Sequence, residues 1–191
     1  MSTPIEILRR EHRVIEGVLR TLDGICVKLQ RGIEIPPEAL LQLIDFIRTY
    51  SDGFHHGKEE AHLFPALAKN GVPRDGGPIA MMIEEHQAGR AFIAELANAA
   101  QGLKAGDPRT VRRFVLGAWR YMELLTMHIQ KEENVLFVIA DEVLDDEALV
   151  SLSEAFEMED AKLGAGLHQK YERIAAELER AWAGEAMTVT R

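Results

Sequence analysis

A ten-residue motif that occurs twice constrains this chain more than any other feature of its sequence. Residues 55–64 read HHGKEEAHLF and residues 128–137 read HIQKEENVLF, so both copies share the pattern H-x-x-K-E-E-x-x-L-F. The shared positions combine imidazole and carboxylate groups, which are metal ligands in proteins, with apolar residues that can anchor a helix. We therefore interpret the motif as a duplicated helix that carries metal ligands.

The repeat extends into the helix that precedes each copy. His12 follows a glutamate and lies 43 residues before His55, and His86 also follows a glutamate and lies 42 residues before His128. Each half of the chain therefore has the form EH…HxxKEExxLF. Two helix hairpins of this form can pack back to back, which predicts a four-helix bundle with approximate twofold symmetry.

The remaining sequence is also typical of helices. Apolar residues recur at steps of three and four, and a breaker-rich connection over 71–78 divides the two halves. No run of alternating β-branched residues indicates a strand. We expect an all-α fold, namely an antiparallel four-helix bundle of two pseudo-symmetric helical hairpins plus a C-terminal helical segment. The expected bundle helices span about 3–32, 36–70, 78–103 and 108–144.

The last part of the chain is expected to add a helical extension to this bundle. A fifth helical region follows Asp145 and Asp146, should break near Gly164 and Gly166, and resumes over 167–182. We therefore divide the chain into three structural parts. The predicted parts are a bundle over 1–144, a C-terminal helical extension over 145–183 that packs on it, and a frayed tail over 184–191.

The spacing inside each motif copy is that of one helix face. Residues four apart lie about one turn apart on the same side of a helix, so His55 and Glu59 can reach the same point of the bundle interior. The second copy repeats this spacing, and the histidine of each Glu-His pair lies on the apolar face of the partner helix. The side chains expected to converge on one internal volume are His12, His55, Glu59, His86, His128 and Glu132.

This set of side chains makes most chemical sense around a positive charge. The alternative is a hydrogen-bonded polar core, but two buried carboxylates carry a large desolvation cost unless they are paired or bind a cation. Imidazole and carboxylate without thiolate suit iron, manganese or zinc. The single cysteine, Cys26, excludes a zinc site built from cysteines.

Two carboxylates among four histidines suggest two metal ions. We expect Glu59 and Glu132 to bridge the ions, as carboxylates do in other bundle cores. By the pseudo-symmetry, the two histidines of the first half bind one ion and those of the second half bind the other. Two iron ions would form a two-electron redox unit that can meet O2, peroxide or nitric oxide, with manganese or zinc as substitutes.

Other polar residues in the motif leave alternatives open. His62 lies three residues after Glu59 and is an additional candidate ligand, although Val135 takes its place in the second copy. His56 and Glu60 repeat the spacing of the chosen pair, but at about 100° per residue they lie further from the centre of the apolar face. We therefore expect His56 at the surface or behind the ligands.

The glutamates beside the candidate ligands are expected to serve one of two roles. Glu60 and Glu133 can accept hydrogen bonds from ligand histidines or remain solvated charges. Glu11 and Glu85 are expected mainly as solvated helix charges, the alternative being that they support the ligands from behind. His168 has no partner at ligand spacing and is expected as a structural or exposed residue, the alternative being that it closes one end of the bundle near the site.

At these residues the chain resembles the bacterial hemerythrin-like proteins, which share the cation-binding pattern H…HxxxE…H…HxxxE. The resemblance covers about residues 5–140. It implies a four-helix bundle with a non-haem di-iron centre. It also implies a role in O2 binding or sensing, in iron handling, or in the response to peroxide and nitric oxide.

The chain departs from the oxygen-carrying hemerythrins at two positions. The carriers have HxxxH on the third helix, whereas the residue four positions after His86 is Arg90 in this chain. The carriers have HxxxxD on the fourth helix, where this chain has His128 followed by Glu132 at HxxxE spacing. These departures argue against reversible O2 carriage and favour sensing, redox reactivity or iron binding.

We therefore expect a non-haem di-iron protein that binds or senses O2 or a related small ligand such as peroxide or nitric oxide. A di-iron redox enzyme that consumes peroxide or nitric oxide is one alternative. An iron-homeostasis protein that stores or senses iron is another. A metal- and ligand-binding role is preferred over that of a dedicated enzyme.

The charge and composition of the chain argue against some classes of binding partner. The formal net charge is -9, which argues against nucleic acid or an anionic membrane as the main partner because both need a basic surface. No apolar stretch is long enough for a transmembrane helix, and charged residues stand where a signal peptide would need its apolar run. We expect a cytoplasmic protein whose partner is a small diatomic ligand or peroxide, with a protein partner or a homodimer left open.

Overall fold

The structure, a computed structural model, describes residues 2–104, 106–164 and 166–183. These residues form helices and contain no strand, which confirms the predicted all-α class. The α-helices are α1 (Pro4–Gln30), α2 (Pro37–Phe46), α3 (Phe64–Lys69), α4 (Pro78–Gln101), α5 (Pro108–Lys131), α6 (Phe137–Val143), α7 (Asp146–Leu163) and α8 (Leu167–Trp182). Three π-helical segments are η1 (Ile47–His56), η2 (Glu59–Leu63) and η3 (Glu132–Leu136).

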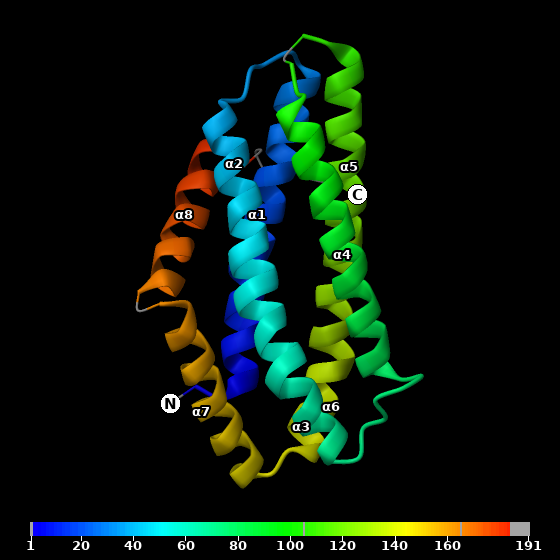
Figure 1. The fold of residues 1–191 in the computed structure, drawn as a ribbon, viewed down its shortest axis with the longest axis vertical. Coiled ribbons are helices and arrows are strands. Elements are labelled where there is room, and N and C mark those ends of the chain that lie inside the picture. Colours follow the sequence, from blue (N-terminus) through cyan, green and yellow to red (C-terminus); the bar gives the residue numbers. More distant parts are fainter. Residues whose placement is uncertain (1, 105, 165, 184–191) are drawn as a thin grey trace, which may run out of the picture.

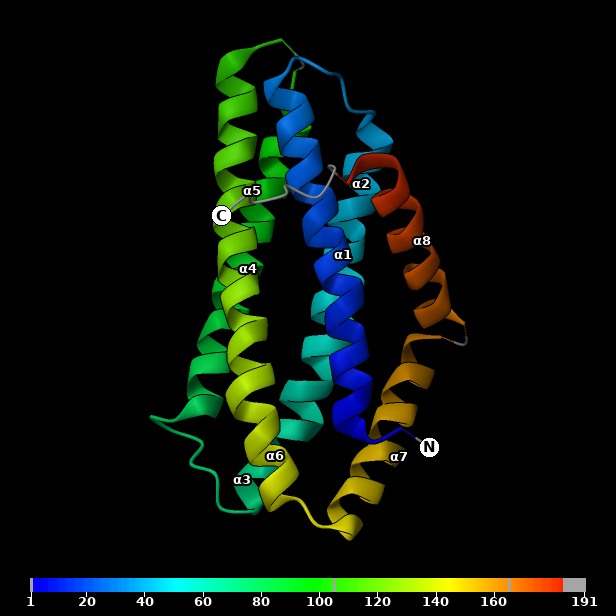
Figure 2. The same cartoon turned by 180° about the vertical axis from the view of Figure 1, so that it is seen from behind.

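The helices assemble into four long antiparallel rods (Figures 1 and 2). The first rod is α1, the second runs from α2 through η1 and η2 to α3, the third is α4, and the fourth runs from α5 through η3 to α6. The predicted bundle of two helical hairpins is therefore confirmed. None of the described helices is long and apolar enough to cross a membrane.

The helix starts are encoded by local sequence. The Thr3 hydroxyl accepts a hydrogen bond from the backbone N–H of Glu6 at 3.1 Å, and the Glu6 carboxylate accepts one from the N–H of Thr3 at 2.8 Å. This reciprocal pair satisfies two donors at the start of α1. Asp107 caps α5 and Asp145 caps α7 in the same way, by accepting from backbone N–H groups.

The core consists of two apolar clusters with a polar layer between them. The larger cluster includes Phe54 and Leu125, just before the motif copies, and the smaller cluster includes Leu63 and Leu136, near their ends. Five histidines and glutamates of the motif copies are buried between these clusters, namely His55, His56, Glu59, His128 and Glu132. The apolar L-F positions of the motif therefore close one side of the polar layer.

Both motif copies widen into a π-helix at the same position. The N–H of Phe64 donates to the carbonyl of Glu59, and the N–H of Phe137 donates to the carbonyl of Glu132, each a step of five residues. Segment η1 adds a longer π-helical stretch immediately before His56. π-helical turns hold more residues than α-helical turns and often occur at functional sites, so they change which side chains face the interior.

The C-terminal extension, α7 and α8, lies along one side of the bundle beside the first two rods (Figure 1). Helix α7 contributes Leu152 and Phe156 to the smaller apolar cluster, and α8 contributes Tyr171 and Leu178 to the larger one. The extension breaks between Leu163 and Leu167, as predicted. The predicted tail, 184–191, lies outside the described residues.

Candidate metal centre

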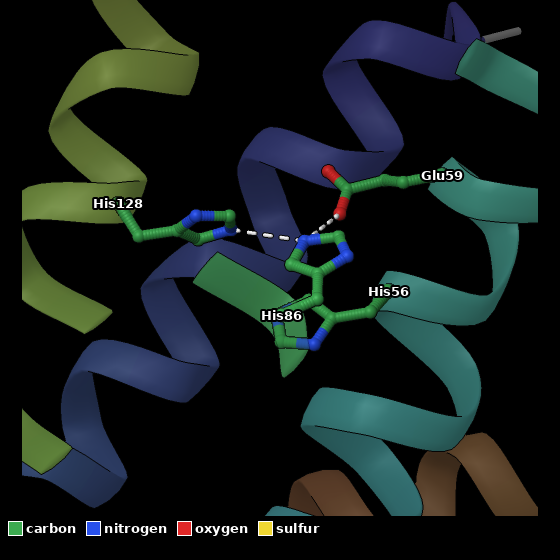
Figure 3. Close-up of side chains that lie close together, drawn as sticks. All are labelled: His56, Glu59, His86 and His128. Carbon is green, nitrogen blue, oxygen red and sulfur yellow. Dashed lines mark hydrogen bonds and ion pairs between the residues drawn. The ribbon is translucent and has the colours of Figure 1, made fainter. Parts of the chain in front are cut away.

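Two groups of ligand-type side chains meet in the polar layer, contributed by all four rods. In each group the candidate ligand atoms lie within 4.8 Å of one another, and every member is buried. The first group is His12, His55, Glu59 and Glu132, and the second group is His56, Glu59, His86 and His128. Figure 3 shows the side chains of the second group pointing toward one another from three rods. The structure thus brings all six predicted residues together.

Each central carboxylate reaches a histidine of both groups. Glu132 Oε2 lies 3.1 Å from His12 Nε2 and 3.3 Å from His128 Nε2. The two oxygens of Glu59 lie 3.5 Å from His55 Nε2 and 3.4 Å from His86 Nε2. Both carboxylates therefore lie between the two halves of the bundle.

The polar layer contains buried atoms whose hydrogen-bonding needs are not met within the described residues. Both carboxylate oxygens of Glu59, Oε1 of Glu132 and Nε2 of His55 are fully buried without a hydrogen-bond partner. Nε2 of His86 and Nε2 of His128 face each other at 3.2 Å. Unpaired buried charges are costly, whereas a cation would engage all these lone pairs at once. The nitrogen and oxygen donor set fits iron, manganese or zinc.

The outer nitrogen of each predicted ligand histidine is held by a glutamate. A carboxylate can only accept, so each Nδ1 carries a proton and each Nε2 faces the interior, where it offers a lone pair once the ring is neutral. The four pairs are His12–Glu133 at 2.8 Å, His55–Glu11 at 3.0 Å, His86–Glu60 at 2.7 Å and His128–Glu85 at 3.0 Å. The neutral imidazole that a metal ion requires is thereby oriented in advance.

These contacts explain the repeated sequence. The second glutamate of each copy, Glu60 or Glu133, bonds the histidine of the opposite half of the chain. The shared phenylalanines cross in the same direction, because Phe137 stacks on His12 at 5.3 Å and Phe64 stacks on His86 at 5.8 Å between ring centroids. The motif therefore fastens the two hairpins to each other.

The glutamate before each helix-face histidine was expected to be mainly solvated, and this prediction is wrong. Glu11 is buried, bonds His55, and accepts from Lys58 at 2.5 Å. Glu85 bonds His128 and accepts from Lys131. The shared lysine of the motif thus holds the glutamate that holds the ligand histidine. The Glu-His pairs and the shared lysines are visible in the sequence. The contact between each lysine and its glutamate is seen only once the rods are packed.

The electrostatics of the layer are those of a site that must hold positive charge. Burial disfavours the charged form of His12, yet its contacts with Glu132 and Glu133 raise its pKa to about 10. Burial also disfavours the charged form of His86, but its contacts with Glu59 and Glu60 raise its pKa to about 9. Metal ligation requires neutral imidazoles, so metal uptake would release protons.

His56 is the candidate ligand that sequence reasoning placed incorrectly. Its ring is buried, stacks on His86 with centroids 3.9 Å apart, and leaves Nε2 without a hydrogen-bond partner among the described residues. Burial and the neighbouring His86 hold the pKa of His56 well below its usual value, so the ring stays neutral. The expectation assumed about 100° per residue, and π-helical η1 breaks that register.

Arg90 supports this arrangement from the third rod. Its guanidinium bonds Asp52 at 2.8 Å and Glu60 at 2.7 Å. Asp52 Oδ1 lies 3.4 Å from His56 Nδ1, and Glu60 bonds His86. The arginine at the position where the oxygen carriers have a second histidine thus steadies the carboxylates behind two other histidines.

The structure does not bring His62 into either group. Its Nε2 lies 3.1 Å from Glu159 of α7, and its side chain is 22% exposed. His168 was expected as a structural or exposed residue, but its Nε2 bonds Glu11 at 3.0 Å, directly behind His55. The alternative interpretation of His168, closure near the site, agrees with this contact.

Comparisons with known proteins agree with this geometry. The hemerythrin HHE cation binding domain model matches residues 3–140. Uncharacterised proteins of Mycobacterium tuberculosis and Mycobacterium bovis are each 25% identical over 175 residues, which is 91% of this chain and 68% of the relative. No solved structure matches the chain. Because the family match spans most of the chain and includes both groups of buried donors, the chain belongs to the hemerythrin HHE cation-binding family.

Proposed function

We propose that this chain is a non-haem di-iron binding protein that binds or senses O2 or a related small ligand, such as peroxide or nitric oxide. The observation that carries the proposal is the pair of four-residue donor groups that share Glu59. The buried carboxylate oxygens without a partner among the described residues support it, because they call for a cation.

The residues divide between the two ions by group. His12, His55 and Glu132 would bind the first ion, the histidines of the second half together with His56 would bind the second, and Glu59 belongs to both groups. Iron is preferred within the proposal because a pair of iron ions can supply two electrons to a small oxidant. Manganese or zinc could occupy the same nitrogen and oxygen donors.

The surroundings favour a small ligand. Apolar clusters close the polar layer on both sides, and Phe64 and Phe137 stack directly on candidate ligands. A surface cavity of 590 Å³ lies elsewhere, between the C-terminal end of α1 and the N-terminal half of α5, and none of its lining residues belongs to either group. A diatomic molecule or peroxide fits a site of this kind better than a larger substrate.

The test is elemental analysis of protein purified without oxygen, with optical spectra before and after exposure to air. About two irons per chain and new near-ultraviolet bands on oxidation are expected, as for other carboxylate-bridged sites in bundles. Glu59→Gln should lose iron, and Glu123→Gln, which changes an exposed glutamate of α5, should keep it. A single zinc, or no metal with an unchanged fold, would contradict the proposal.

A further inference from the structure

Helices α7 and α8 of the C-terminal extension reach the metal centre on the side of the first group. Behind His55, the pair Glu11 and Lys58 is covered by α7 and α8, and the Lys58 side chain is 0% exposed. Behind His128, the equivalent Lys131 is 32% exposed. The lysine occupies the same motif position in both copies, and α7 and α8 cover it in the first.

The contacts from the extension are polar and specific. Asp160 of α7 lies 2.8 Å from Lys58 Nζ. His168 of α8 bonds the same Glu11 oxygen that accepts from Lys58, at 3.0 Å. The other Glu11 oxygen accepts from His55 Nδ1. A chain of contacts therefore leads from both helices of the extension, through one buried carboxylate, to a candidate metal ligand.

Charge explains why this carboxylate needs the extension. A buried lysine between two carboxylates, and a buried glutamate with three donors, are each satisfied only when every partner is present. Without Asp160, the buried Lys58 would depend on Glu11 alone and draw it away from His55. Without His168, one oxygen of Glu11 would have Lys58 as its only donor. In either case the position of the His55 ring becomes less well defined.

We infer that the C-terminal extension completes the first metal group, with Asp160 and His168 acting as positioning residues that hold His55 through Glu11. This inference rests on the proposed function, because it concerns retention of the ion bound by His12 and His55. Within the described part of the chain, no hydrogen bond or ion pair joins α7 or α8 to Glu60 and Glu85, the glutamates behind the second group. The two ions should therefore respond differently when the contacts from the extension are removed.

The experiment measures iron release from protein loaded anaerobically with ferrous iron and then mixed with a ferrous chelator. The test variant is Asp160→Ala combined with His168→Phe, which removes both contacts but keeps an aromatic ring against Tyr50. One of the two irons should be released at least about 10-fold faster, as expected when a residue behind a metal ligand is lost. The other iron should leave at the wild-type rate.

Two controls distinguish a specific effect on the position of His55 from a general stabilisation of the bundle. Glu179→Gln breaks an exposed pair between α8 and Arg20 and should leave both release rates unchanged. Adding Glu85→Gln to the test variant should accelerate the remaining iron, because Glu85 holds His128 in the second group. Thermal melts of the metal-free proteins report any loss of fold independently of the metal.

Unchanged release in the test variant would overturn the inference. So would equal acceleration of both irons with a matching loss of metal-free stability, since that pattern means that the extension only braces the bundle. Failure of the proposed function looks different, because the wild-type protein itself would then bind no iron, and both ideas would fall together.

Discussion

The two copies of the motif share a sequence pattern but not an environment. In the first copy Lys58 is fully buried beneath the extension, and in the second Lys131 pairs with Glu85 and remains partly exposed. The first copy also carries His56 where the second has Ile129. The duplicated sequence thus specifies the contacts common to both groups, and residues outside the shared pattern make the groups unequal.

The largest expected effect comes from the two central glutamates. Glu59 belongs to both donor groups, and Glu132 belongs to the first alone. Glu59→Gln should therefore lower the iron content of both groups, whereas Glu132→Gln should retain more iron, since even a change behind a metal ligand costs about 10- to 100-fold in metal affinity. Iron content per chain after anaerobic loading measures this. Equal iron in the two variants would show that the central carboxylates are equivalent.

The lysines should differ strongly in their contribution to stability. Lys58→Met leaves Glu11 and Asp160 without their shared cation, and breaking a buried ion pair costs about 3–5 kcal/mol. Lys131→Met removes a partly exposed pair, for which about 1 kcal/mol or less is expected. Urea unfolding of the metal-free proteins gives both values. Losses of the same size would mean that burial under α7 adds nothing.

The extra histidine should matter only to the second group. His56→Ile introduces the residue found in the second copy and removes a neutral nitrogen donor from that group. We expect one iron to dissociate about 10- to 100-fold faster, with the metal-free melting temperature unchanged or higher because a buried polar ring is gone. Chelator-release kinetics measure the rates. If both irons keep their wild-type rates, His56 is not a ligand.

The smallest effect is expected at His62. Changing His62→Val copies the second motif, and its contact with Glu159 is partly exposed, so stability should change by about 1 kcal/mol or less. Iron content and both release rates should match the wild-type protein, because His62 lies in neither group. Loss of iron in this variant would reinstate His62 as a ligand and contradict the arrangement described above.

The sequence determined the parts of this protein that depend on local rules. Helical periodicity, caps such as Thr3 and breakers such as Gly71 specify the rods and their order. The duplicated spacing specifies which histidines and glutamates share a face. Because i and i+4 geometry is fixed within a helix, the pairs His55 with Glu59 and His128 with Glu132 follow from spacing alone.

Tertiary structure decided what depends on register and on contacts between distant segments. π-helical η1 rotates His56 inward, and a sequence read at a constant angle per residue misses this change. Glu11 was expected to be mainly solvated because nothing in its own helix shows that Lys58 and His168 will cover it. Such contacts arise only when rods and extension pack, since their partners lie 47 and 157 residues away along the chain.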